Sequence, residues 1–199
     1  MANLLHIIER LLSNLKWLMI SLKQLIRLVK NWIKISVLFV SPFWYCKPIK
    51  IVLRDGKILI CPRNYLFEVI AETLLINVYK FPTDTPLDVV VDIGASVGDS
   101  LLPIIDKARR IYAFEPNPYR FYFLIQTISE NRANNVIPLM RFASYGTLEE
   151  ILSIESEIDF LKIDCEGCEY DVLNVSGDTL KRIKRISIEI HYRGEQNAK

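Results

Sequence analysis

The N-terminal part of the chain alternates hydrophobic and polar residues with the period of an α-helix. Between residues 3 and 34, polar side chains recur every three or four positions, and Leu, Ile, Val, Met and Trp fill the positions between them. This spacing predicts one long amphipathic helix with a broad apolar face and a basic stripe opposite. We expect Ser41 and Pro42 to end it, because proline cannot continue a helix.

This predicted helix does not have the composition of a membrane-spanning segment. The longest uncharged run beside it, Ile35 to Cys46, is shorter than the roughly 18–20 residues that a bilayer crossing requires. Charges also interrupt the region that a cleavable signal peptide would need to be apolar. Trp17 and Trp32 among the apolar positions are typical of a helix that lies on a membrane surface. Packing against the rest of the protein or against another copy would bury the same face, so this alternative stays open.

A hairpin pattern follows the helix. The apolar runs Ile49–Leu53 and Lys57–Ile60 flank Arg54, Asp55 and Gly56, and Asp-Gly supplies the positive φ that a tight turn needs. Residues 65–79 then have helical periodicity. We therefore divide the chain into a helix and linker (residues 1–45) and a second domain (residues 46–199), with the hairpin and helix in residues 46–86 and an α/β core in residues 87–199.

The core alternates strand and helix patterns. Continuous apolar runs are typical of parallel strands buried on both faces, and they occur at Val89–Ile93, Ile111–Phe114, Val136–Met140, Phe160–Ile163 and Ile186–Ile190. Helical patterns lie between most of them, at Asp99–Ala108, Tyr119–Asn131, Thr147–Ile154 and Tyr170–Leu173. The order predicts an α/β fold with a doubly wound, Rossmann-like parallel sheet.

Charge is distributed unevenly along the 199 residues. The net charge is +2, yet residues 1–40 carry six basic side chains and one acidic side chain, while the remainder holds 19 basic and 22 acidic residues. A basic arm on a slightly acidic body indicates an anionic partner for the arm, such as an anionic membrane surface. The same distribution argues against a nucleic-acid-binding face on the body.

The four cysteines are Cys46, Cys61, Cys165 and Cys168. They show no disulfide framework spacing, so we expect a reduced chain in the cytoplasm. Cys165 and Cys168 have C-x-x-C spacing, which raises metal and redox alternatives. A zinc site would want two more ligands, and the chain has only two histidines, His6 and His191. We therefore expect no metal and interpret the two cysteines as small buried apolar residues.

The first candidate for chemistry is the turn after Val89–Ile93. Asp92 comes at the end of the strand, and Gly94 and Gly98 let the backbone turn sharply and approach a ligand. The G-x-x-x-G spacing differs from that of dinucleotide-binding turns, and no Gly-Lys-Ser/Thr of a P-loop follows. Glu115 ends the next strand, at the separation where an acid reaches a ribose hydroxyl pair. Together the two elements indicate an adenosine-type ligand.

The second candidate is the segment from Asp159 to Glu169. Lys162 and Asp164 share one face of a buried strand, where charges are costly unless paired. We predict that Lys162 pairs with Asp92, Asp164 or Glu189. Ser187, Glu189 and His191 alternate along the last strand and can reach the same edge, although His191 is equally compatible with a surface position near the chain end.

These segments resemble the FkbM-type methyltransferases over roughly residues 50–192. The resemblance rests on the glycine turn from Asp92 to Gly98, on Phe114-Glu115-Pro116-Asn117, and above all on the block from Phe160 to Glu169; Thr147 to Glu150 and Ile188 to His191 are similar to minor blocks. The resemblance implies a class I fold and methyl transfer from S-adenosylmethionine, usually to an oxygen and often on a sugar. Relatives carry a longer stretch between Asn135 and Thr147 and a closing pair of strands, so we expect a shortened sheet that lacks the last strands.

The resemblance implies roles for particular residues. We expect the cofactor S-adenosylmethionine to be held by Asp92, Gly94, Ala95, Ser96, Gly98, Glu115, Pro116 and Asn117. Asp164, Glu166 and His191 are the catalytic candidates, which would orient or deprotonate an acceptor hydroxyl; a structural ion-pair cluster with Lys162 is the alternative for the two acids.

The leading hypothesis for function is an O-methyltransferase acting on a glycan or glycolipid, in the cytoplasm or peripherally on the inner face of the membrane, with homo-oligomers as a further option. A catalytically inactive module for membrane or subunit association is the main alternative. An NAD-dependent oxidoreductase fits less well, because the glycine spacing is wrong for it.

Overall fold

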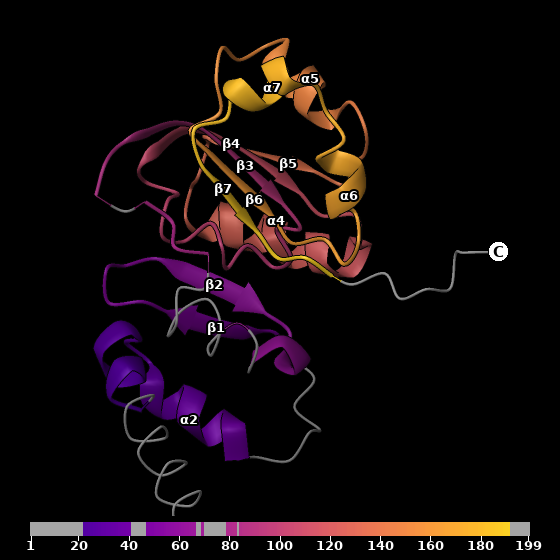
Figure 1. The fold of residues 1–199 in the computed structure, drawn as a ribbon. Helices are drawn as coiled ribbons and strands as arrows, with labels where there is room; N and C mark the ends of the chain where they lie inside the picture. The colour runs from indigo at the N-terminus through magenta and orange to yellow at the C-terminus, as the bar shows by residue number, and fades with distance from the viewer. Residues whose placement is uncertain (1–21, 41–46, 67–68, 70–78, 83, 192–199) are drawn as a thin grey trace, which may run out of the picture. The chain divides into compact units, whose positions relative to one another are not determined.

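The computed structural model describes residues 22–40, 47–66, 69, 79–82 and 84–191. Contacts between Cα atoms divide the chain into two compact units, residues 1–77 and residues 78–199. The hairpin thus belongs with the N-terminal segment, whereas the sequence had suggested a division before it. Each unit is described by itself below (Figure 1).

In the first unit, helical residues 22–28 and α2 (Trp32–Val40) accompany a two-stranded sheet of β1 (Ile49–Val52) and β2 (Ile58–Cys61), followed by the short helix η1 (Arg63–Tyr65). The predicted hairpin is confirmed: Val52 pairs with Ile58, and Gly56 takes φ +94°. α2 ends at Val40, directly before the expected breakers.

The prediction of one continuous helix over residues 3–34 is wrong at residues 29–31. Val29 bridges to Leu53, and the Lys30 N–H donates to the Val52 carbonyl at 2.7 Å. The Asn31 side chain accepts from the Val52 N–H at 2.9 Å and donates to the Lys50 carbonyl at 2.8 Å. The Lys30 N–H, which would donate within a continuous helix, therefore donates to the edge of β1 instead. The predicted helical residues 3–21, and most of the helix expected at residues 65–79, lie outside the described residues.

No helix within the described residues is long and apolar enough to cross a bilayer.

The second unit contains a five-stranded parallel sheet with the order β5-β4-β3-β6-β7. The strands are β3 (Leu87–Ile93), β4 (Ala108–Phe114), β5 (Val136–Leu139), β6 (Phe160–Ile163) and β7 (Ile186–Ile188). All five predicted strands are present. The chain winds outward from β3 to β5, then returns to the other side of β3 with β6, so the order reverses next to β3. Open α/β sheets bind ligands beyond the carboxyl ends of their strands at such a reversal.

Helices cover both faces of this sheet (Figure 1). α4 (Pro118–Glu130) contributes Leu124 to a core with Val90 and Ile111 on one face. α5 (Thr147–Leu152) and α6 (Glu169–Val172) contribute Leu148 and Val172 to a second core on the other face, and α7 (Gly177–Lys181) follows them. Alternate residues of one strand serve the two cores because successive side chains point to opposite faces. The predicted α/β Rossmann-like fold is confirmed.

The helix expected over Asp99–Ala108 is absent. Residues 99–107 form consecutive turns, and Ala108 already belongs to β4. Pro103 lies in the middle of this segment and lacks an N–H, and a proline disfavours the helical conformation of the residue before it. The apolar residues are nevertheless buried as expected, because Leu101, Ile104 and Ile105 pack into the core with α4.

Candidate active site

The glycine turn after β3 is fixed to the strands on both of its sides. The N–H groups of Gly94 and Ala95 both donate to the Phe114 carbonyl at 2.9 Å, which joins the turn to the end of β4. Gly94 has φ +85°, and a Cβ there would lie 1.7 Å from the Asp164 carbonyl oxygen. Gly94 is therefore required by the close approach of the loop after β6, which its local sequence does not indicate.

Glu115 lies at the carboxyl end of β4 and reaches back to this turn. Its Oε2 accepts from the Ser96 N–H at 3.0 Å, and its Oε1 accepts from the Asn117 N–H at 2.8 Å. The side chain is only 2% exposed. Asn117 in turn caps α4, since its Oδ1 accepts from the N–H groups of Tyr119 and Arg120. Glu115, Ser96 and Asn117, predicted as cofactor residues from separate motifs, therefore lie together.

The remaining capacity of Glu115 fits an adenosine-type cofactor. A carboxylate offers about four acceptor positions, and Ser96 and Asn117 use one on each oxygen. Each oxygen can therefore accept one further donor, which is what the two hydroxyls of a ribose require. Asp92 has other partners: it is fully buried and receives the Ser100 hydroxyl on Oδ2 at 2.5 Å and the Lys162 ammonium beside Oδ1. Its contacts are those of a structural residue.

Lys162 is the centre of a buried charged network. Its side chain is 2% exposed; Nζ lies 3.1 Å from Asp92 Oδ1 and 3.9 Å from Asp164 Oδ2, and it donates to the Gly94 carbonyl at 2.8 Å. The predicted pairing of Lys162 with a carboxylate is confirmed, and Asp92 is the nearest partner. Asp92 and Lys162 are direct neighbours in the register of β3 and β6, which explains the choice.

Tyr79 completes this network and was not foreseen. Its hydroxyl donates to Asp164 Oδ2 at 2.5 Å, and Lys162 Nζ lies 4.5 Å from the centre of its ring. Burial, followed by the hydrogen bond to Asp164, raises the pKa of Tyr79, so the phenol stays protonated and serves as a donor. Asp164 is therefore held by two partners, Tyr79 and Lys162. Nothing in the sequence around Tyr79 indicated this role, because its partner is 85 residues away.

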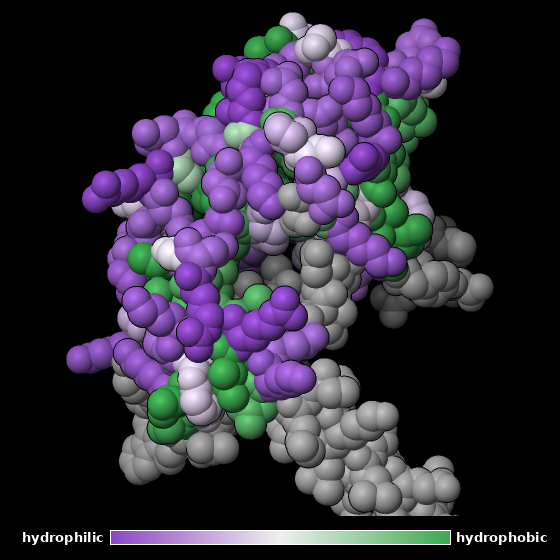
Figure 2. Space-filling view, turned by 90° about the vertical axis from the view of Figure 1, so that its left-hand side faces the viewer, coloured by the Kyte–Doolittle hydropathy of each residue, from purple (hydrophilic) through white to green (hydrophobic). Residues whose placement is uncertain are grey.

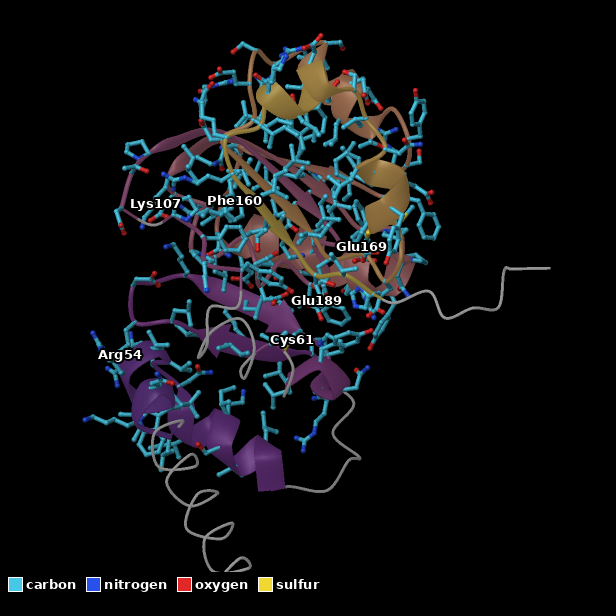
Figure 3. The ribbon with its side chains drawn as sticks, viewed as in Figure 1. Arg54, Cys61, Lys107, Phe160, Glu169 and Glu189 are labelled. Atoms are coloured by element: carbon cyan, nitrogen blue, oxygen red, sulfur yellow. A yellow bond between two sulfur atoms is a disulfide. The ribbon has the colours of Figure 1, made fainter. Side chains whose placement is uncertain are left out.

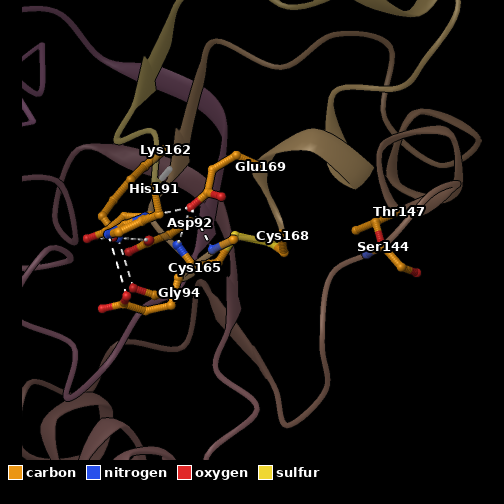
Figure 4. The surroundings of a disulfide bond; sticks show 12 residues. Asp92, Gly94, Ser144, Thr147, Lys162, Cys165, Cys168, Glu169 and His191 are labelled. Carbon is orange, nitrogen blue, oxygen red and sulfur yellow. Dashed lines mark hydrogen bonds and ion pairs between the residues drawn. A yellow bond between two sulfur atoms is a disulfide. The ribbon is translucent and has the colours of Figure 1, made fainter. Parts of the chain in front are cut away.

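His191 lies after β7, at the same end of the sheet. Its Nδ1 is 2.8 Å from Glu169 Oε1, a carboxylate that is 2% exposed (Figure 4). Its Nε2 faces Glu166 at 3.6 Å, Glu189 at 3.8 Å and Asp164 at 4.0 Å. The structure thus brings the three catalytic candidates together. It adds Glu169, which the sequence had singled out only as part of a motif.

The carboxylates around His191 change its protonation. The hydrogen bond to Glu169, which outweighs desolvation, raises the pKa of His191. Burial opposes ionisation of Glu169, but hydrogen bonds from His191 and from backbone N–H groups outweigh it and hold the pKa of Glu169 below its usual range. An ionised Glu169 can only accept at Nδ1, so with this partner a neutral imidazole would carry its proton on Nδ1 and leave Nε2 unprotonated. This geometry can take a proton from a hydroxyl group.

The two ends of the sheet, where the strands begin and where they end, carry different residues. Figure 3 shows Glu169 and Glu189 at the carboxyl end, and Lys107 and Phe160 at the opposite end, where β4 and β6 begin. Ser187, in register with Lys162, lies within β7 and is partly buried. The carboxyl end of the sheet therefore gathers all the predicted site residues.

The expectation for the cysteines is corrected by the structure. Cys165 and Cys168 form a disulfide in the loop between β6 and α6, so the pair is not reduced. Both side chains are only partly buried, and both pack against the core under α5 and α6. Residues 165 and 168 are close enough to bond because the loop folds back on itself, which spacing alone does not show. Within the described residues, no group of three or more His, Cys, Asp and Glu side chains is arranged to hold a metal ion.

Comparisons with known proteins locate the family match in the second unit. Residues 125–199 match the Methyltransferase FkbM domain. A curated relative, the tRNA(Phe) (4-demethylwyosine(37)-C(7)) aminocarboxypropyltransferase of Methanocaldococcus jannaschii, is 38% identical over 55 residues, which are 27% of this chain and 22% of that protein. The chain therefore spans about a fifth of the length of this relative.

Two solved structures have similar chain traces over part of their length. Trm5b from Pyrococcus abyssi is 21% identical with a TM-score of 0.44, over 67% of this chain and 37% of that one. The methyltransferase FkbM from Methylobacillus flagellatus is 20% identical with a TM-score of 0.45, over 63% of this chain and 43% of that one. This chain therefore spans less than half the length of either protein.

The family match covers the β5–β7 half of the sheet and includes Lys162, Asp164, Glu166, Glu169 and His191, whereas the glycine turn and Glu115, which also carried the resemblance, lie outside it. The match agrees with that resemblance: residues 125–199 are similar to the Methyltransferase FkbM domain.

Proposed function

We propose that this protein is an S-adenosylmethionine-dependent methyltransferase that methylates a hydroxyl group of a glycan or glycolipid near a membrane. The observation that carries the proposal is the junction of Glu115 with Ser96. It places an acid with spare acceptor positions beside a glycine turn, at the point where the strand order of the sheet reverses. His191 and its carboxylates occupy the neighbouring strand ends.

Different residues of the chain would bind the cofactor, orient the acceptor and remove its proton. Glu115, with the backbone around Ser96 and Asn117, would hold the ribose of the cofactor. When bound, S-adenosylmethionine would supply an electrophilic methyl group, and the protein must position an acceptor oxygen and remove its proton. His191 Nε2 would take that proton, and Glu169 would stabilise the resulting imidazolium through Nδ1. Asp164, fixed by Tyr79 and Lys162, would orient the acceptor.

Calorimetric titration of the full chain with S-adenosylmethionine tests the cofactor role. Glu115→Ala should weaken binding by about 1–3 kcal/mol, roughly 5- to 150-fold, because buried hydroxyl groups would lose a charged acceptor. Glu150→Ala is the matched control, since Glu150 is exposed and pairs only at the surface with Arg141. Equal affinity of a folded Glu115→Ala variant and the control would remove Glu115 from the ribose role, and binding of NAD instead would favour an oxidoreductase.

The membrane part of the proposal rests on the N-terminal segment. In its described portion, the basic residues Lys23, Arg27, Lys30 and Lys34 are exposed, and so are large apolar side chains, among them Ile33 and Val37 at 63% and 56%. Elsewhere the face in Figure 2 is mostly hydrophilic, with hydrophobic side chains in smaller patches. A basic helix with exposed apolar residues favours an anionic membrane surface, to which each Lys or Arg contributes about 1 kcal/mol.

Liposome sedimentation tests this association. The full chain should sediment with anionic liposomes, less at high salt, and hardly with neutral ones, because the attraction is electrostatic. The full-length triple variant Lys23→Glu, Arg27→Glu, Lys30→Glu should remain in solution. Equal sedimentation of both proteins, or of neither, would refute membrane docking, and concentration-dependent self-association would then take its place.

Two other functions make different predictions. An inactive association module would bind no S-adenosylmethionine. A transferase acting on RNA is suggested by the curated relative, which is named for tRNA(Phe), although the slightly acidic composition after residue 40 does not favour nucleic acid. Mass spectrometry of glycans, lipids and RNA from cells with and without the gene distinguishes the acceptors by which fraction loses a methyl group.

A further inference from the structure

The disulfide lies between the two acidic residues that organise the site. Cys165 directly follows Asp164, and Cys168 directly precedes Glu169, so the bond closes the loop that separates these carboxylates (Figure 4). Asp164 is held by the Tyr79 hydroxyl and by Lys162 of β6. Glu169 begins α6. The covalent bond therefore fixes the start of α6 relative to the end of β6.

The same loop supplies the groups that hold Glu169. Its Oε1 accepts from the Gly167 N–H at 3.1 Å and from the Cys165 N–H at 3.4 Å, and it also contacts His191 Nδ1. Both donors belong to the loop that the disulfide closes. Glu166 and Gly167 within it have φ +57° and +112°, a conformation that is unfavourable for glutamate. The donors point toward Glu169 only while the loop keeps this shape.

The disulfide is placed where a reductant can reach it. Both cysteine side chains are partly exposed, unlike Cys61, which is fully buried and outside any disulfide. Disulfides within C-x-x-C spacing, and those of proteins in reducing compartments, are commonly exchanged or used as sensors. A bond needed only for stability has little to gain from a ring this short, because the entropy removed from the unfolded chain grows with loop length.

We propose that Cys165 and Cys168 form a thiol–disulfide exchange site that sets the Glu169–His191 pair. A dithiol attacks one sulfur, so that the Cys165–Cys168 bond breaks and a mixed disulfide forms. The second thiol of the reductant then displaces the other protein thiol. The protein gains two electrons and two protons as two thiols, and the dithiol leaves as its own disulfide. With the loop open, Gly167 and Cys165 no longer align their N–H groups on Glu169, and the contact of Glu169 with His191 loosens.

Thiol trapping tests whether the exchange occurs in the folded protein. The full chain is treated with dithiothreitol under native conditions, alkylated, and digested for mass spectrometry. The peptide containing residues 165 and 168 should be unmodified before reduction and doubly alkylated after it. A folded protein in which this peptide stays unmodified after reduction, or is already alkylated without it, would overturn the proposal.

The protonation of His191 tests the consequence. The chain has two histidines, so NMR titration of His6→Gln protein reports His191 alone. Oxidised protein should show a raised pKa of His191, and reduction should move it back toward the ordinary value. The double variant Cys165→Ala, Cys168→Ala should have the His191 pKa of reduced protein, and dithiothreitol should not change it. Cys61→Ser is the control and should respond to dithiothreitol as the parent does. Glu169→Gln should lower the pKa of His191 even with the disulfide intact.

An unchanged pKa of His191 on reduction, or a double-alanine variant that behaves like oxidised protein, would refute the link between the disulfide and Glu169. None of these measurements involves cofactor or acceptor, so their outcome is independent of the proposed methyltransferase function.

Discussion

The buried charge of Lys162 offers the sharpest test of how this sheet is stabilised. Lys162→Met keeps the length of the side chain and removes the ammonium. It leaves the Asp92 carboxylate, 0% exposed, without its cation, and it leaves the Gly94 carbonyl without its donor. At 3.1 Å and an effective dielectric constant of about 20, the attraction between Lys162 and Asp92 is about 5 kcal/mol. Desolvation offsets much of this attraction in the intact pair, but the uncompensated charge in the variant has no such offset.

We therefore expect Lys162→Met to lower the free energy of unfolding by about 3–5 kcal/mol. The double variant Asp92→Asn, Lys162→Met should recover at least half of that loss, because neither charge then remains buried. Lys181→Met is the matched control: its ion pair with Asp178 is exposed, and we expect no measurable change.

Urea unfolding followed by circular dichroism, with amide exchange in β3 and β6, measures these differences. Tryptophan fluorescence does not suit the question, since all three tryptophans precede residue 78 and report on the first unit. If Lys162→Met is as stable as Lys181→Met, or if the double variant is no more stable than the single one, the buried ion pair does not contribute to stability as we expect.

Two further predictions concern the same loops. Gly94→Ala should destabilise the protein by at least about 3 kcal/mol, because a Cβ would meet the Asp164 carbonyl oxygen. Gly146→Ala is the control: its φ is nearly the same but the space around it is open, so it should cost only about 1–2 kcal/mol. Urea unfolding compares the two variants, and equal losses of stability would mean that backbone strain alone is involved. Because the pKa of His191 is raised in the folded protein, its pairing with Glu169 stabilises the fold fully below the unfolded pKa, and this contribution is lost as pH rises through the folded pKa. The difference in stability between the parent and Glu169→Gln should therefore be larger at about pH 6 than at about pH 9. Denaturant titrations measure it, and a difference that does not change with pH would contradict this role of His191.

Local rules in the sequence determined the secondary structure of the α/β unit and the location of its site. Buried parallel strands need continuous apolar runs, so all five strands could be identified, and the ends of β3, β4 and β6 followed from the glycine or acidic residue after each of them. The Asp-Gly turn of the hairpin is local in the same sense. The FkbM-like block around Lys162 could be recognised for the same reason, since its residues are consecutive, and it lies within the segment that matches the Methyltransferase FkbM domain.

The helical pattern failed to predict the backbone in two segments, in one because of a long-range contact and in the other because of a proline within the segment. Residues 29–31 keep a helical pattern but pair with the edge of β1, and residues 99–107 keep the apolar spacing of a helix while Pro103 prevents the backbone from forming one. In both segments burial of the apolar residues followed the pattern, but the hydrogen bonding did not.

Only the tertiary structure decided which side chains act together. The sequence left Lys162 with three potential partners, and the choice of Asp92 depends on the parallel register of β3 and β6. Tyr79 meets Asp164 across 85 residues, and Glu169 meets His191 across 22. Hydrophobic periodicity reports which face of an element is buried, but the pairing of polar groups depends on distances between elements that no local pattern encodes.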